Sequence, residues 1–210
     1  MQKTGDKMTD ELSAKASNAA KTCERQILFI QGGGAGTHDE WDNKLVASLE
    51  RRLGQGWAVR YPRIPSESDP KFAMWSAAIA GEIGKLDTGA ILVGHSIGGT
   101  VLVHTVATQP QLLEGVAAIC LIAAPFVGEG GWPSDEIKQR PNWANPLAGV
   151  PVFLYQGDAD QTTPTAHADL YAKAMPWAQL HRLKGRDHQL NDDLSEVAQD
   201  ILQHAGKARS

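Results

Sequence analysis

Short apolar runs alternate along the chain with segments in which apolar residues recur every three or four positions. Four of the runs are almost continuously apolar, which is typical of strands buried on both faces of a parallel sheet. The runs predict strands at residues 27–30, 57–61, 90–93, 116–123, 152–155 and 179–183.

The amphipathic segments between these runs predict helices at residues 39–53, 71–85, 97–108, 165–174 and 191–204. The first carries apolar residues at four-residue spacing, which predicts that they share one buried face: Trp41, Leu45, Leu49 and Leu53. Strands that alternate with helices of this length imply right-handed crossovers between parallel strands. The expected fold is therefore α/β: a doubly wound, mostly parallel sheet of about six strands in a three-layer αβα sandwich.

The chain is expected to consist of a polar N-terminal tail and one folded domain. Residues 1–25 scatter lysines and acids around a single large aliphatic residue, Leu12, and are expected to form a tail that is flexible or a short helix. They contain no continuous apolar stretch of the kind a secretory signal needs, so the expected compartment is the cytoplasm. Residues 26–210 are predicted to form one α/β domain, in which residues 127–149 break the alternation as a short lid-like insertion.

Composition and net charge argue against several classes of binding partner. The 210 residues suffice for one sizeable core, and 20 Lys and Arg against 24 Asp and Glu give a net charge of −4. Nucleic acids and anionic membranes require a basic footprint, so neither is expected as a partner. No window reaches the roughly 18 apolar residues of a membrane span. The cysteines and histidines lack metal-ligand spacing, so we expect no metal and no cofactor, and a small-molecule substrate remains as the expected partner.

The sharpest motif is GHSIG at residues 94–98, which follows a predicted strand and precedes a predicted helix. A serine in so tight a turn takes a strained backbone conformation, which leaves no room for bulky side chains two residues before or after it. The motif predicts Ser96 as a nucleophile at a helix N-terminus, where free N–H groups favour a developing anion. The alternative is an ordinary glycine-rich turn, but the spacing of phosphate and dinucleotide loops is absent.

A nucleophilic serine requires a base and an acid that orients the base. Asp158 and Asp160 follow one predicted strand, and His188 follows the last one, at the sheet edge where catalytic groups collect in such folds. His188 is the predicted base and Asp160 the predicted acid, with Asp158 as the alternative. His95 is expected to pack beneath Ser96, and the remaining histidines are interpreted as structural: His38, His104, His167, His181 and His204.

The first predicted strand ends in the glycine-rich stretch QGGGAG at residues 31–36. Glycines let a backbone approach a reacting centre, so the N–H groups of Gly33 and Ile97 are the predicted oxyanion hole; a flexible loop is the alternative. Gly32, Trp132 and Trp143 are predicted to line the substrate pocket, although packing of the tryptophans against the core would also explain them.

Together, GHSIGG at residues 94–99, GDADQTTP at 157–164 and GRDH at 185–188 resemble the α/β-hydrolase superfamily, over nearly all of residues 26–205. The resemblance implies a trimmed α/β-hydrolase fold and favours Asp160, three residues after the loop's glycine, as the acid. Two features depart from the family: Gln31-Gly32 replaces its frequent His-Gly, and the polar N-terminal stretch offers no counterpart to its first two antiparallel strands. In size and layout the chain is similar to the small lidless serine hydrolases of the retinoblastoma-binding and YdeN-like kinds.

This resemblance implies a serine hydrolase of carboxylesterase type. Ser96, His188 and Asp160 would cleave small ester, thioester or amide substrates through an acyl-enzyme. A C–C hydrolase or a cofactor-free peroxidase could use the same residues. A non-catalytic binding module that retains the fold is a further alternative. The sequence carries no indication of the oligomeric state.

Overall fold

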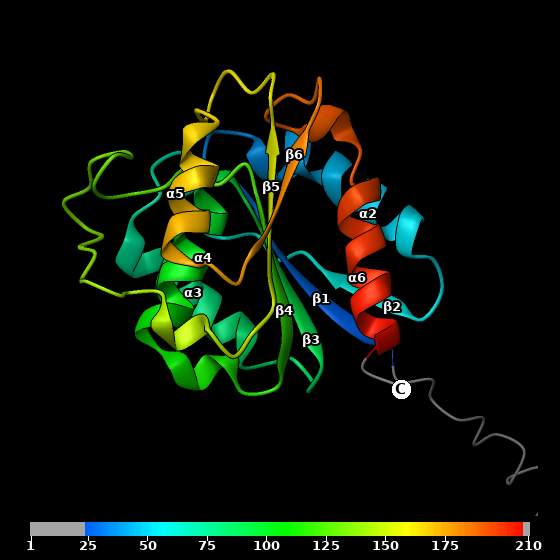
Figure 1. Ribbon diagram of the computed structural model, residues 1–210. Coiled ribbons are helices and arrows are strands. Elements are labelled where there is room, and N and C mark those ends of the chain that lie inside the picture. Colours follow the sequence, from blue (N-terminus) through cyan, green and yellow to red (C-terminus); the bar gives the residue numbers. More distant parts are fainter. Residues whose placement is uncertain (1–23, 208–210) are drawn as a thin grey trace, which may run out of the picture.

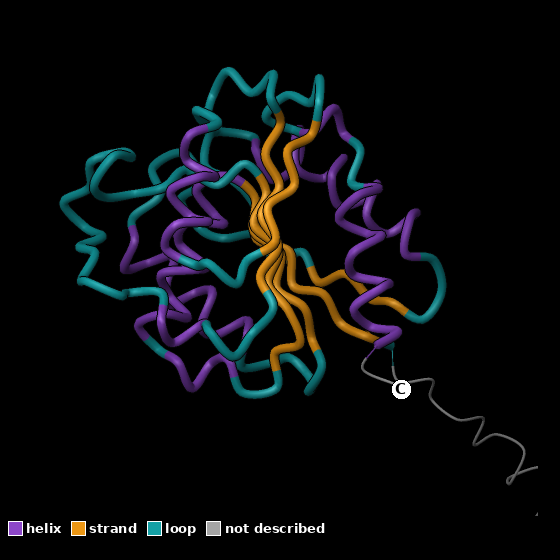
Figure 2. Tube along the Cα trace, in the orientation of Figure 1, coloured by secondary structure: helices purple, strands orange, loops and turns teal. Residues whose placement is uncertain are grey.

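The computed structural model describes residues 24–207, and a β-sheet lies at its centre (Figure 2). The sheet has six strands in the order β2-β1-β3-β4-β5-β6. Every neighbouring pair is parallel. The strands are β1 (Arg25–Ile30), β2 (Trp57–Arg60), β3 (Ala90–His95), β4 (Val116–Ile122), β5 (Val152–Gly157) and β6 (Gln179–Leu183). Most of the predicted tail, residues 1–23, lies outside the described residues, and β1 begins at Arg25, the tail's last predicted residue.

Helices cover both faces of the sheet, which confirms the predicted doubly wound, three-layer fold (Figure 1). One face carries α3 (Phe72–Ile83), α4 (Ser96–Thr108) and α5 (Ala166–Ala174), and the other carries α2 (Asn43–Leu53) and α6 (Ser195–Lys207). The short helical turns are the π-helix η1 (Thr37–Asp42) and the 3₁₀-helices η2 (Pro110–Leu113), η3 (Asn145–Leu147) and η4 (Leu190–Asp192). None of the helices in the described range has the length and apolarity to cross a bilayer.

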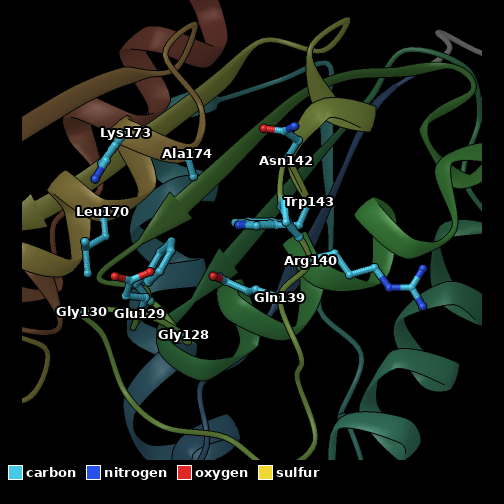
Figure 3. Close-up of a pocket in the computed structure, with 13 residues that line it drawn as sticks. Gly128, Glu129, Gly130, Gln139, Arg140, Asn142, Trp143, Leu170, Lys173 and Ala174 are labelled. Carbon is cyan, nitrogen blue, oxygen red and sulfur yellow. The ribbon is translucent and has the colours of Figure 1, made fainter.

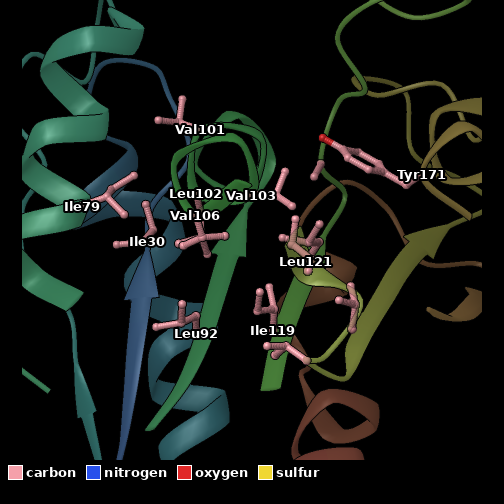
Figure 4. Close-up of a cluster of buried hydrophobic side chains, with 14 of the residues drawn as sticks. Ile30, Ile79, Leu92, Val101, Leu102, Val103, Val106, Ile119, Leu121 and Tyr171 are labelled. Carbon is pink, nitrogen blue, oxygen red and sulfur yellow. The ribbon is translucent and has the colours of Figure 1, made fainter. Parts of the chain in front are cut away.

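Successive strand residues point to opposite faces and build two separate cores. In β1, Leu28 and Ile30 face α3 and α4, whereas Ile27 and Phe29 face α2 and α6. Figure 4 shows part of the first core, where side chains of α3 and α4 meet those of the central strands. Because the central strands are buried on both sides, the sheet is a rigid platform for the loops at its carboxyl edge.

The first predicted helix, 39–53, is two elements in the structure, and the predicted position of Trp41 is wrong. Residues 37–42 form the π-helix η1, which contains one residue more per turn than an α-helix, and α2 begins only at Asn43. The extra residue changes the helical phase, so Trp41 is 50% exposed and Asp42 is fully buried. The rest of the predicted face, including Leu45 and Leu49, is buried as expected.

The last predicted helix, 191–204, begins later than expected. Leu190, Asn191 and Asp192 have φ angles of 49°, 56° and 55°, which no right-handed helix accepts. The carboxylate of Asp193 then accepts the N–H of Ser195 at 3.1 Å, so helix α6 starts after this acid rather than before it.

The lid-like insertion, residues 127–149, contains neither an α-helix nor a named strand; its only regular element is η3. Its end is anchored in the core by Ala144 and Leu147, which are buried. Its middle is tied to the first turn of α3, because the carboxylate of Glu136 accepts the N–H of Phe72 at 2.6 Å. The insertion is therefore a loop fastened to the helices beneath it.

Candidate active site

Ser96 occupies the junction between the central strand and its helix. Strand β3 ends at His95 and α4 begins at Ser96, whose φ of 50° lies in the left-handed region that is unfavourable for a side chain. The turn is also crowded: a Cβ at Gly98 would lie 1.9 Å from the carbonyl oxygen of Gln31, and one at Gly94 would lie 2.5 Å from the Cα of Gly99. The glycines are therefore required to let the serine stand at the helix N-terminus.

The structure brings the three predicted triad residues together from three different loops. His188, after β6, places Nε2 3.0 Å from the Oγ of Ser96. Its other nitrogen, Nδ1, lies 2.9 Å from Oδ2 of Asp160, which follows β5. Both distances are those of hydrogen bonds, and the serine, the imidazole and the carboxylate form one continuous line.

The Asp160 carboxylate is held in its charged form. Its side chain is fully buried, and burial by itself would raise the pKa. Hydrogen bonds from His188 and from the N–H groups of Thr163 and Thr162 outweigh burial, so the pKa of Asp160 lies below its ordinary value. A fixed, negatively charged acceptor thus faces Nδ1 of His188.

Asp158, the alternative acid, occupies a different position. It is exposed, and its Oδ1 accepts the N–H of Gly185 at 2.6 Å. This contact ties the β5 loop to the β6 loop that carries His188. The two acids therefore have different partners: Asp160 contacts the imidazole of His188, and Asp158 accepts a backbone N–H of the neighbouring loop.

The glycine-rich loop after β1 lies against Ser96. A Cβ on Gly32 would lie 3.2 Å from that of Ser96, and one on Gly33 would lie 2.7 Å from Cγ2 of Ile97. The N–H of Gly32 donates to Asp42 at 2.7 Å, and the N–H of Gly34 donates to the carbonyl of Glu67 at 2.6 Å. Among residues 24–207 the N–H groups of Gly33 and Ala35 meet no acceptor. Gly33 is the one that lies against Ile97, so its N–H is the candidate donor for a ligand at Ser96.

Two acids that support this loop were not found by sequence reasoning. The Glu67 carboxylate accepts from Nε2 of Gln31 at 2.6 Å, and also from the N–H groups of Gly36 (2.9 Å) and His38 (3.1 Å). Glu67 stands in a polar loop, and nothing in the sequence marks it. Asp42 did leave a signal, because it is a carboxylate at helical spacing from the apolar residues of α2.

The predicted pocket tryptophans lie on the insertion, apart from the triad. Trp132 is 38% exposed and sits edge-on to His167, with ring centres 5.5 Å apart. Trp143 stacks on His104 at 4.3 Å and lines a cavity of about 780 Å³ between the insertion and α5 (Figure 3). The triad residues are not among the described residues that line this cavity. A role for the tryptophans in substrate binding stays a prediction.

Across the described range, the His, Cys, Asp and Glu side chains form no group of three or more that could hold a metal ion. The chemistry available at this site is that of a serine hydroxyl, an imidazole, a carboxylate and free N–H groups, the components of acyl transfer.

Solved structures of similar fold span most of the chain. Est1E from Butyrivibrio proteoclasticus is 17% identical, with 90% of this chain and 91% of that chain covered and a TM-score of 0.61. A YdeN-like hydrolase from Pectobacterium atrosepticum is 19% identical, with 93% and 97% covered and a TM-score of 0.60. XC6422 from Xanthomonas campestris, described as an α/β serine hydrolase without a lid, is 18% identical, with 87% and 81% covered and a TM-score of 0.57. At these identities the likeness shows the fold alone.

A search of curated proteins gave no match. The sequence model of the family described as serine hydrolase matches residues 27–193, which is most of the chain. The match and the fold together confirm the resemblance carried by the three motifs: the chain belongs to the serine hydrolase family, with a small, trimmed form of the α/β-hydrolase fold.

Proposed function

We propose that the protein is a carboxylesterase-type enzyme that cleaves small esters by acyl transfer to Ser96. The observation that carries this proposal is the position of the His188 ring between two partners. Its nitrogens lie 3.0 Å from the Oγ of Ser96 and 2.9 Å from Oδ2 of Asp160. The strained turn at Ser96 is then a nucleophile elbow.

The arrangement specifies the acylation step. The Asp160 carboxylate holds the imidazole proton on Nδ1, so that the lone pair on Nε2 faces the serine hydroxyl. As Oγ attacks the ester carbonyl, Nε2 takes its proton, and the carbonyl electron pair moves onto oxygen. The N–H groups of Gly33 and Ile97 hold that oxyanion. Its collapse breaks the bond to the alcohol, which leaves with the proton from His188.

Deacylation repeats these steps with water in place of the serine. His188 takes a proton from the water as its oxygen attacks the acyl carbon, and the second oxyanion forms at the same N–H groups. Its collapse breaks the bond to Oγ of Ser96 and returns the proton to Oγ. The acid is released and the free enzyme is restored.

The short insertion supports a small acyl group. Residues 127–149 contain no α-helix, so the insertion supplies no helical cap to enclose a long chain. Est1E, which shares the fold, has been solved with ferulic acid bound. Thioesters and amides undergo the same chemistry and belong to the same proposal.

The test combines turnover with labelling of the serine. We expect the protein to hydrolyse p-nitrophenyl acetate and to react with a fluorophosphonate probe. Ser96→Ala should lower kcat by about 10⁴-fold or more and abolish the label, because the nucleophile is lost. Ser195→Ala, which changes a serine at the start of α6, is the matched control and should keep both.

Three results would contradict the proposal. Undiminished labelling of Ser96→Ala at another residue would refute the nucleophile. A wild-type protein that takes up no probe and cleaves nothing across acyl-length series of esters, thioesters and peptides would favour a non-catalytic binding module. Probe labelling without any hydrolysis of these substrates would point to C–C hydrolysis or cofactor-free peroxidase chemistry.

A further inference from the structure

A second acid–histidine pair lies directly beneath Ser96. His95 and Asp42 are 1% and 0% exposed at their side chains, and Nδ1 of His95 lies 2.9 Å from Oδ2 of Asp42. The other ring nitrogen, Nε2, lies 3.1 Å from the backbone carbonyl oxygen of His188. The acyl transfer to Ser96 uses neither side chain.

The contacts of His95 favour its charged form. A backbone carbonyl can only accept, and Oδ2 of Asp42 already accepts the N–H of Gly32 at 2.7 Å. Beside an ionised Asp42, a neutral imidazole has one N–H and would satisfy only one of the two acceptors. Both contacts are made when His95 is an imidazolium and Asp42 a carboxylate.

The electrostatics of the pair agree with this assignment. Burial lowers the pKa of His95, but the Asp42 charge and its hydrogen bond, with the His188 carbonyl and Asp160, outweigh burial and raise it above its ordinary value. Burial likewise raises the pKa of Asp42, but His95 and the donors Gly32 and Gln189 outweigh burial and bring it below its ordinary value. The two groups hold each other in their charged forms.

The pair connects the parts of the site that must be aligned. Asp42 accepts from the loop after β1 through Gly32, and its Oδ1 accepts from Nε2 of Gln189 at 3.3 Å in the loop after β6. His95 belongs to the turn that presents Ser96 and holds the backbone of His188. The π-helix η1 turns Asp42 inward to make these contacts, and such turns are frequent at functional sites.

We propose that Asp42 and His95 form a charged positioning pair, which fixes the glycine loop, Ser96 and His188 relative to one another. This inference rests on the proposed function. His95 is not a second base, because both of its nitrogens are committed to acceptors. It acts through the residues it holds rather than on the substrate.

The pair therefore acts on the rate of the chemical step. Small displacements of aligned groups cost about 10²-fold in rate, and supporting contacts of a site are worth about 10–100-fold. The glycine loop, Ser96 and His188, which the pair holds, contact the atoms whose charge changes in the transition state. Loss of the pair should therefore lower kcat and leave KM nearly unchanged.

The experiment compares Asp42→Asn with a matched control, Asp200→Asn. Asp200 also accepts a buried hydroxyl, that of Tyr155 at 2.8 Å, and lies 3.1 Å from a histidine, His181, but it belongs to α6 and not to the site. With p-nitrophenyl acetate, Asp42→Asn should lower kcat about 10–100-fold with KM within about threefold. Asp200→Asn should lower the melting temperature and leave kcat unchanged. Equal kcat values for the two variants would overturn the positioning role.

A second measurement reads the charge of His95 directly in the wild type. In the full chain with ¹⁵N-labelled histidine, His95 should show two protonated ring nitrogens at pH 7, above the ordinary pKa of an imidazole. The His95→Gln spectrum assigns the signal. Hydrolysis by a wild type whose His95 is neutral at pH 7 would overturn the inference alone. A wild type that is inactive but shows the charged pair would overturn the proposed function, and the positioning role with it.

Discussion

Two acid–histidine pairs flank Ser96, and they differ in what the second ring nitrogen meets. The acid-to-ring distance is 2.9 Å both for Asp160–His188 and for Asp42–His95. In the first pair the free nitrogen faces the Ser96 hydroxyl, and in the second it faces a backbone carbonyl. The side chain of His188 is 16% exposed, against 1% for His95.

The partner of the second ring nitrogen decides the role of each pair. A hydroxyl can donate, so it leaves a lone pair on His188 that can take a proton. A carbonyl only accepts, so it fixes a proton on His95 and excludes it as a base. The same kind of acid–histidine contact therefore supports proton transfer in the Asp160–His188 pair and alignment in the Asp42–His95 pair.

The largest effect on kcat is expected when the histidines of the two pairs are replaced separately by glutamine. His188→Gln removes the proton acceptor and should lower kcat by about 10⁴-fold or more, close to 5.5 kcal/mol of transition-state stabilisation. His95→Gln should reduce kcat far less and the melting temperature more, because it disrupts a buried pair. Steady-state kinetics and thermal unfolding measure both. Equal losses of kcat would remove the distinction between the pairs.

A smaller effect should appear in the pH dependence of stability. The pKa of Asp42 is lowered from its ordinary 3.8, so its contribution is full above about pH 3.8 and is lost as pH falls through the lowered value. The pKa of His95 is raised from 6.5, so its contribution is full below about pH 6.5 and is lost as pH rises through the raised value.

We therefore compare the wild type with an Asp42→Asn/His95→Gln double variant. The free energy of unfolding of the wild type should exceed that of the variant by the largest amount between about pH 4 and pH 6.5. On either side this difference should decline by about 1.4 kcal/mol for each unit of pKa shift. Urea unfolding from pH 3 to pH 9 measures the difference. A difference independent of pH would mean that the pair is not charged in the folded protein.

The smallest effect is expected at Asp158. Asp158→Asn keeps an oxygen that can accept the N–H of Gly185, so kcat should change by less than about threefold and stability by about 1 kcal/mol or less. Asp160→Asn, measured beside it, should lower kcat by orders of magnitude, because the acceptor that orients His188 is lost. A reversed ranking would transfer the role of the acid to Asp158.

The sequence was sufficient for the sheet and for the candidate triad, because both follow from local rules. Continuous apolar runs are typical of central strands of a covered sheet, and the predicted strand positions were close to those observed. Ser96 was marked by glycines that its turn requires. Asp160 and His188 follow parallel strands, whose carboxyl ends meet at one edge.

The supporting contacts could not be predicted, because they join residues that are distant in the sequence. The helical spacing of Asp42 indicates that it is buried but not which residue it contacts. Asp42 and His95 are 53 positions apart, and Gln31 and Glu67 are 36 apart. The helical phase around Trp41 was wrong because the spacing of apolar residues does not reveal a π-turn. Such contacts depend on the folded arrangement of several loops rather than on any one of them.

The π-helix Thr37–Asp42 also sets the length of the connection between β1 and α2. Removing one residue from it would rotate helix α2 by about 100° relative to the glycine-rich loop after β1. Either Asp42 would then turn away from His95, or the apolar face of α2 would turn away from the sheet. The connection is a spacer of fixed length, in which the number of residues is constrained as tightly as their identity.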